Sequence, residues 1–190
     1  EMATGQRPWI KPTIQIVGLR FANDRGAEIT YSVDFKNVGK SPAQNIKSRL
    51  VAAIMTEQNA ITSIDEERNQ CDLARKDSGN DMFPGIFLFP DEEAPDLIGG
   101  KGIGRAYVSA AEYSKAWPSP DKLTFKIFGC FDYSFSTEAG RHGSTGFAYL
   151  VSKKIPEKPG LQTWFSPVVG EVPIDQIIFR KDPFSGGFVN

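Results

Sequence analysis

Ile29-Thr30-Tyr31-Ser32-Val33-Asp34-Phe35-Lys36 is the stretch that decides the fold. Its odd-numbered residues are apolar or aromatic, and its even-numbered residues are polar. Because successive side chains of a β-strand point to opposite faces, this period of two predicts a strand with one buried face and one solvated face. A sheet that is wet on one side is typical of antiparallel proteins. We therefore expect an all-β, mostly antiparallel fold.

The segments next to this stretch predict two further strands. Segment 9–17 has Pro12 near its start, which fits an outer strand because proline lacks the N–H that a ladder needs. Turn-forming residues fill 37–42, and apolar positions then recur with a period near two in segment 46–54. We expect this last strand to pair with 29–36, which would then be an interior strand of a sandwich.

Segment 62–77 breaks the strand pattern and predicts a helical insertion resting on the sheets. Ser63 is a suitable cap for its first turn. Acidic residues then occupy the first turn and basic residues the last, as the helix dipole favours; these residues are Asp65, Glu66, Glu67, Arg75 and Lys76.

The second strong β signal is a pair of aromatic-rich runs, 123–136 and 144–153, which predict a hairpin. Gly129 interrupts the first run, as a bulge or as a site of close approach. Phe128 and Cys130 lie on the opposite parity from the main apolar set, which suggests that both faces of this strand are covered near its middle.

The rest of the chain is less regular. Segment 110–117 fits one helical turn. Segment 155–190 contains five prolines and predicts an extended C-terminal strap with one short strand or turn at 175–180. The 190 residues fit a single domain, residues 1–190, with one core.

Charge and hydropathy exclude some partners. There are 22 Lys and Arg residues against 23 Asp and Glu residues, a net charge of -1, so no global field attracts nucleic acid or an anionic membrane. No run of about 18 apolar residues occurs, so no helix of this sequence is expected to cross a bilayer. The chain starts at Glu1, which we interpret as a processed protein or a fragment with an anchor or signal upstream.

Two cysteines, Cys71 and Cys130, leave two alternatives open. They fit one disulfide in an oxidising compartment, or two buried thiols. Their long spacing does not indicate a metal knuckle.

Two regions resemble a known group. Arg7-Pro8-Trp9-Ile10, the alternating strand and the run from Phe35 to Ala43 resemble uncharacterised bacterial membrane-anchored proteins, in which a transmembrane region precedes an immunoglobulin-like extracytoplasmic domain. Segment 129–147 resembles the later hairpin of that group. The resemblance implies an antiparallel immunoglobulin-like β-sandwich and a periplasmic or other extracytoplasmic location, with the membrane reached only through a segment absent from this chain. It transfers no catalytic residue.

Catalytic and metal chemistry finds little support. His142 is the only histidine, and no nucleophile motif such as G-x-S-x-G accompanies it, so an exposed turn residue is the simpler interpretation. One histidine and two distant cysteines lack the ligand spacing of a zinc site. The acidic residues of 91–96 lack the spacing of a calcium loop and fit a solvated loop. We expect no metal and no cofactor.

Four residues remain as ligand-binding candidates. Lys101 lies within a glycine-rich run and Arg105 follows it; the run resembles an anion nest, but it lacks the phosphate-loop motif, and a flexible turn is the simpler interpretation. Trp117 and Trp164 are candidates for lining a carbohydrate or peptide groove, although burial explains most aromatic residues of a sandwich.

Three functions are consistent with these patterns. The first is a non-catalytic extracytoplasmic binding or protein-interaction domain of a bacterial envelope protein, with an unknown protein partner. The alternative is a hydrolase or carbohydrate-processing enzyme whose carboxylates converge in a polar cleft. A third is a structural domain of an envelope assembly, which would show a broad apolar surface and symmetric contacts.

Overall fold

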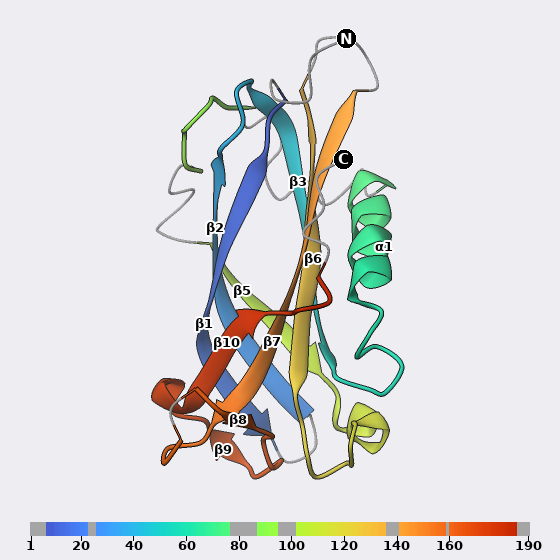
Figure 1. Cartoon of the computed structure of the whole chain (residues 1–190), viewed down its shortest axis with the longest axis vertical. Coiled ribbons are helices and arrows are strands. Elements are labelled where there is room, and N and C mark those ends of the chain that lie inside the picture. Colours follow the sequence, from blue (N-terminus) through green and yellow to red (C-terminus); the bar gives the residue numbers. More distant parts are fainter. Residues whose placement is uncertain are drawn as a thin grey trace.

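Two antiparallel β-sheets pack face to face in this computed structural model, which describes residues 7–22, 26–76, 87–94, 102–135, 141–158 and 160–185. Sheet A has the order β5-β2-β1-β9, and sheet B has the order β10-β7-β6-β3-β4, with β8 pairing on β7 (Figure 1). The fold is mostly β, as predicted.

The strands of sheet A are β1 (Ile10–Ala22), β2 (Gly26–Asn37), β5 (Gly102–Val108) and β9 (Gly170–Glu171). Those of sheet B are β3 (Ala43–Ile54), β4 (Phe87–Leu88), β6 (Phe125–Ser134), β7 (His142–Lys154), β8 (Gln162–Thr163) and β10 (Ile177–Lys181). The helices are α1 (Ser63–Lys76) and the short 3-10 segments η2 (Ala110–Lys115) and η3 (Ile174–Gln176).

Strand β2 is the interior strand that its alternation predicted. Ile29, Tyr31 and Phe35 are buried between the sheets, while Thr30 and Lys36 keep contact with solvent. The strand pairs with β1 on one side and with β5 on the other. The outer-strand prediction for 9–17 is close to the structure, because β9 covers only Arg20 and Phe21 at the far end of β1.

The expected pairing of segment 46–54 with 29–36 is wrong. The third strand, β3, pairs with β6 and with β4 in the opposite sheet. The buried side chain of Asn37 holds the crossing turn: its oxygen accepts the N–H groups of Trp9 and Gly39, and its amide donates to the carbonyls of Ser41 and Leu88. The turn therefore leads the chain across the core, and β5 takes the place beside β2.

Aromatic rings fill the space between the sheets. Near the end of the sandwich where β6 starts, Phe21, Phe125 and Phe165 form one cluster with ring centroids about 6 Å apart. Toward the other end, Phe35 of sheet A packs on Phe131 of sheet B with centroids 4.9 Å apart. These contacts join the two faces that the strand alternation predicted to be apolar.

Helix α1 covers the outer face of sheet B, lying alongside β6 (Figure 1). It begins at Ser63 and ends at Lys76, as predicted for the insertion. A disulfide joins Cys71 of the helix to Cys130 of β6, with the two Cα atoms 5.0 Å apart. Strand β6 is consequently buried on both faces, in agreement with the prediction from Phe128 and Cys130.

The hairpin and the C-terminal segment complete sheet B. Strands β6 and β7 pair antiparallel without a register shift, so Gly129 is not a bulge. A Cβ placed there would meet the carbonyl oxygen of Arg49 and the ring of Phe147, which makes it a site of close approach. The predicted strap contributes β8, β9 and β10, and β10 extends sheet B by pairing with β7. Segment 110–117 contains the short helix η2.

Candidate functional site

The outer face of sheet A carries side chains that are exposed to solvent, in contrast to the covered outer face of sheet B. We call this surface the open face and define it by the outward residues of β1, β2, β5 and β9 with the adjoining helix η3. They are Val17, Arg20, Glu28, Thr30, Ile103, Arg105, Tyr107, Glu171 and Ile174.

A row of charged and aromatic side chains crosses all four strands of the open face. The strand register places Glu28 between Tyr107 and Arg20, and it places Arg20 opposite Glu171. Arg105 adds an ion pair to this row, with its Nε 3.8 Å from Oε1 of Glu28. Because the charges alternate in sign, neighbouring strands attract one another while every charge still reaches water.

A shallow hollow interrupts the open face beside this row. Its volume is about 420 Å³, and it lies between β1, β2 and the segment 171–174. The β1–β2 register shifts between Ile16 and Gly18, and Gly18 has no side chain to fill the space. Arg20, Glu28 and Glu171 supply its charges, whereas Val17 and Ile174 supply apolar rims.

A second hollow, of about 330 Å³, lies farther along the same sheet and is lined by Thr13, Gln15, Asp34, Phe35, Lys36, Glu93 and Ala94. Both volumes are near the lower end of those that enclose small molecules. Shallow, charged depressions on a sheet suit the surface of a macromolecular partner better than an enclosed ligand.

The structure separates the four candidate residues. Arg105 lies on the open face, and Lys101 is outside the described residues. Trp117 and Trp164 lie at the end of the sandwich where β3 finishes and β6 starts. Arg105 and the two tryptophans therefore belong to different surfaces.

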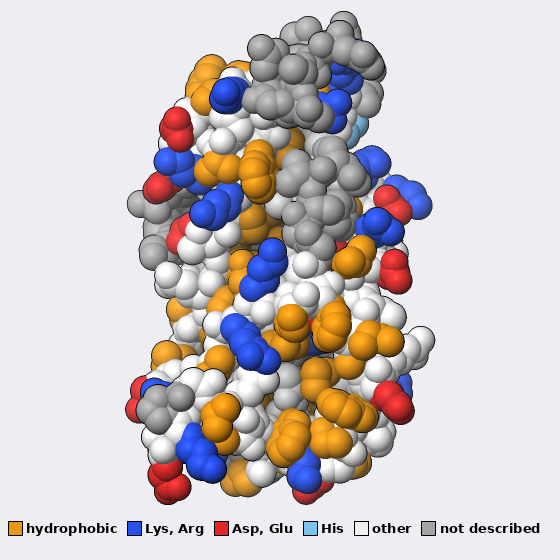
Figure 2. Space-filling model, in the orientation of Figure 1, with side chains coloured by type: hydrophobic (Ala, Val, Ile, Leu, Met, Phe, Trp, Pro, Cys, Tyr) orange, Lys and Arg blue, Asp and Glu red, His pale blue; other side chains and the backbone are white. Residues whose placement is uncertain are grey.

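The two tryptophans are half-exposed on adjacent loops. The N–H of Trp117 donates to the carbonyl of Met55, and the ammonium of Lys122 lies 5.1 Å from the ring centroid of Trp164. Apolar side chains gather over the lower half of the face in Figure 2, where these loops lie. Each ring is partly packed against the protein and partly exposed to solvent. Trp117 and Trp164 therefore remain candidates for contacting a ligand.

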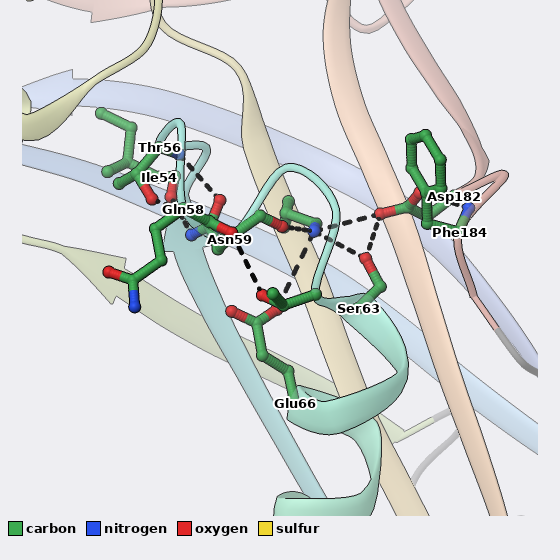
Figure 3. A network of polar contacts seen from close by, with 10 residues as sticks. Ile54, Thr56, Gln58, Asn59, Ser63, Glu66, Asp182 and Phe184 are labelled. Carbon is green, nitrogen blue, oxygen red and sulfur yellow. Dashed lines mark hydrogen bonds and ion pairs between the residues drawn. The ribbon is translucent and has the colours of Figure 1, made fainter.

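A buried polar network, which sequence reasoning missed, lies beneath the N-terminus of α1 (Figure 3). The ammonium of Lys126 donates to Oγ of Ser63 at 2.6 Å and to the carbonyl oxygen of Asn59. It also lies 3.2 Å from Oδ2 of Asp182 and 3.8 Å from Oε2 of Glu66. The signal in the sequence was a lone lysine in the apolar run from Phe125 to Phe128.

A second buried carboxylate lies at the other end of α1. Asp132 contacts Nε of Arg75 at 3.2 Å and Nδ1 of His142 at 3.3 Å. His142 is exposed, as predicted, but it is the first residue of β7 and not part of a turn, and it contacts a buried acid. Burial raises the pKa of Asp132, and Arg75 and His142 oppose that rise. Burial likewise raises the pKa of Glu66, against the attraction of Lys126.

Asp132 and Asp182 lie beneath α1, Glu66 belongs to its first turn, and none of the three lines either hollow. Ser63 and Lys126 are close enough for a catalytic serine-lysine pair. Both are fully buried, however, and a nucleophile must reach its substrate.

Among the described residues, no group of three His, Cys, Asp or Glu side chains is placed to hold a metal ion. In the acidic loop, Asp91 forms an ion pair with Lys36 at 3.6 Å, while Asp96 is outside the described residues.

No family model, curated protein or solved structure matches the chain. Within the part of the chain that the structure describes, no helix is long and apolar enough to span a membrane.

Proposed function

We propose that this protein is a non-catalytic binding or protein-interaction domain, and that the open face of sheet A is its binding surface. The observation that carries the proposal is the asymmetry of the two sheets. Helix α1 covers the outer face of sheet B and is fixed there by a disulfide, while Ile103 and Tyr107 of sheet A are 69% and 62% exposed.

The composition of the open face fits a protein partner. Tyrosine and arginine are enriched at protein interfaces, where they supply apolar contact area and directed hydrogen bonds. Tyr107 and Arg105 stand two residues apart on the outward side of the edge strand β5. An unpaired strand edge also offers backbone hydrogen bonds to a partner strand. The alternating charges favour a partner that carries both signs.

An immunoglobulin-like sandwich in the envelope of a bacterium is the setting that we infer for this domain. Two packed antiparallel sheets support the sandwich, and the Cys71–Cys130 disulfide supports an oxidising compartment. Attachment to the membrane would come through a segment outside this chain. The proposed attachment is supported by the sequence resemblance alone, whereas the proposed location is supported by the resemblance and by the disulfide.

The alternative of a hydrolase or carbohydrate-processing enzyme has less support. It calls for at least two carboxylates with perturbed pKa values in a polar cleft. Glu66 and Asp132 do have raised pKa values, but Glu66 is in the first turn of α1, Asp132 lies at the other end of the helix, and neither lines a hollow.

Site-specific photo-cross-linking in cells tests the proposal. A photoreactive residue in place of Tyr107 is expected to capture a discrete protein partner. The matched control places the same residue at Ile64, an exposed apolar position on α1. Capture of the same partner at Ile64 with equal yield, or capture at Ile64 alone, would contradict the assignment of the open face.

A further inference from the structure

We propose that Lys126 and Asp182 are joined by an intramolecular amide cross-link between Nζ of the lysine and Cγ of the aspartate, with Glu66 as the proton carrier. Lys126, Asp182 and Glu66 are not part of the open face. They belong to the buried network at the N-terminus of α1, on the side of sheet B that faces the helix (Figure 3).

The two reacting groups are buried and held close together. Lys126 is fully buried, Asp182 is 2% exposed, and Nζ lies 3.2 Å from Oδ2. Lys126 is fixed within β6, and the backbone N–H of Asp182 donates to the carbonyl of Ala148 at 3.0 Å. The 3.2 Å contact places the amine directly against the carboxyl group that it would attack, and holding both groups on a rigid frame converts a slow bimolecular condensation into a unimolecular one.

Each oxygen of the Asp182 carboxyl group also accepts a hydrogen bond. The hydroxyl of Ser63 donates to Oδ2 at 2.7 Å, and the N–H of Phe184 donates to Oδ1 at 2.9 Å. Donors in these positions polarise the carboxyl carbon and stabilise the negative charge that develops on oxygen when an amine attacks. The site is therefore arranged for addition at Cγ as well as for an ion pair.

Glu66 is placed to move the protons. Its Oε2 lies 3.8 Å from Nζ of Lys126. Burial, together with the nearby Asp182 and Glu67 carboxylates, raises its pKa, so this group holds a proton at a higher pH than a free glutamate does. An acid that exchanges protons closer to neutral pH is an effective proton carrier.

The reaction is a dehydration that balances without an oxidant or any other reagent. Proton transfer from the Lys126 ammonium to Asp182 gives a neutral amine and a neutral acid. The lone pair of Nζ attacks Cγ, the N–C bond forms, and the carbonyl electron pair moves to oxygen. Glu66 accepts a proton from the nitrogen and delivers one to the leaving hydroxyl. The C–O bond breaks, so that one ammonium and one carboxylate become one amide and one water.

Mass spectrometry of the full chain tests the cross-link. After reduction and denaturation, the intact protein is expected to weigh one water less than its sequence. A protease digest is expected to contain a branched peptide that joins the Lys126 and Asp182 segments. The branched peptide decides the result, because a loss of mass alone does not locate the bond. Recovery of the two segments only as separate linear peptides would overturn the proposal.

Two variants test the part played by Glu66. Glu66→Gln preserves the size of the side chain but removes its acid-base function, and it is expected to lose the branched peptide. Glu57→Gln, at an exposed loop position, is the matched control and is expected to keep it. Far-ultraviolet circular dichroism verifies that both variants are folded. A folded Glu66→Gln protein that forms the branched peptide at the wild-type yield would overturn the assignment of Glu66.

Discussion

Single residues decide how closely the strands approach one another, and Gly129 is the sharpest case. A side chain at this position would collide with the backbone carbonyl of Arg49 and with the ring of Phe147. We expect Gly129→Ala to lower the free energy of unfolding by about 1–3 kcal/mol or more, the usual cost of overpacking a core. Urea denaturation measures this change.

Gly18→Ala is the matched control for that experiment. A Cβ at Gly18 would make only an ordinary contact with Thr30 at 3.5 Å. We expect it to change stability by no more than a fraction of the Gly129→Ala effect. Equal losses in the two variants would show that backbone conformation, and not close approach, determines the glycine requirement.

Asp132 should make stability depend on pH. Burial raises its pKa above the ordinary value of 3.8, so the folded state binds this proton more tightly than the unfolded chain does. The stability that this tighter proton binding contributes is therefore fully present below pH 3.8, and it is lost as the pH rises through the folded-state pKa of Asp132. We expect the stability of the wild type relative to Asp132→Asn to fall over that window.

Urea unfolding at several acidic pH values, carried out on both proteins, checks this linkage. The comparison removes the contributions that the two proteins share. A wild-type advantage that grows as the pH rises would contradict the direction of the shift at Asp132.

At the scale of the elements, the disulfide fixes α1 on sheet B. It closes a chain separation of 59 residues between Cys71 and Cys130. Removing it in the double variant Cys71→Ala/Cys130→Ala is expected to cost about 2–4 kcal/mol, typical for the loss of a native disulfide. Hydrogen exchange should accelerate most in α1. Unchanged unfolding midpoints, with equal exchange in α1, would contradict this role.

Helices and strands with strong local patterns could be predicted from the sequence, whereas the choice of which strands pair with one another could not. The alternation of 29–36, the aromatic hairpin and the charge bias of 62–77 each depend on neighbouring residues, and all three formed as expected. The pairing of β3 depends on which way the chain leaves Asn37. That direction is set by hydrogen bonds to Leu88 and Trp9, which lie far apart in the sequence.

The candidate sites follow the same distinction. The sequence marks out Arg105, but as part of a flexible turn or an anion nest, whereas the structure places it on strand β5. The Lys126 network could not be predicted from the sequence, because Asn59, Ser63 and Asp182 come from a loop, a helix and the segment after β10. Only the packing of α1 on β6 brings these groups together.

At the scale of the whole molecule, one sheet is covered and the other is open. The helix and its disulfide protect sheet B, and the C-terminal strands extend its edge. The outward side chains of sheet A are left to solvent, where Tyr107 and Arg105 stand among alternating charges. This division assigns stability to one half of the sandwich and recognition to the other.

The affinity of the purified domain for its cross-linked partner tests this division most directly. We expect Arg105→Glu/Tyr107→Ala to weaken binding roughly thirtyfold, which corresponds to about 2 kcal/mol for an interface hot spot. The matched variant Arg180→Glu/Ile64→Ala, at exposed positions on sheet B and on the helix that covers it, should bind like the wild type. Equal affinity of the wild type and Arg105→Glu/Tyr107→Ala would contradict the open face as the binding surface.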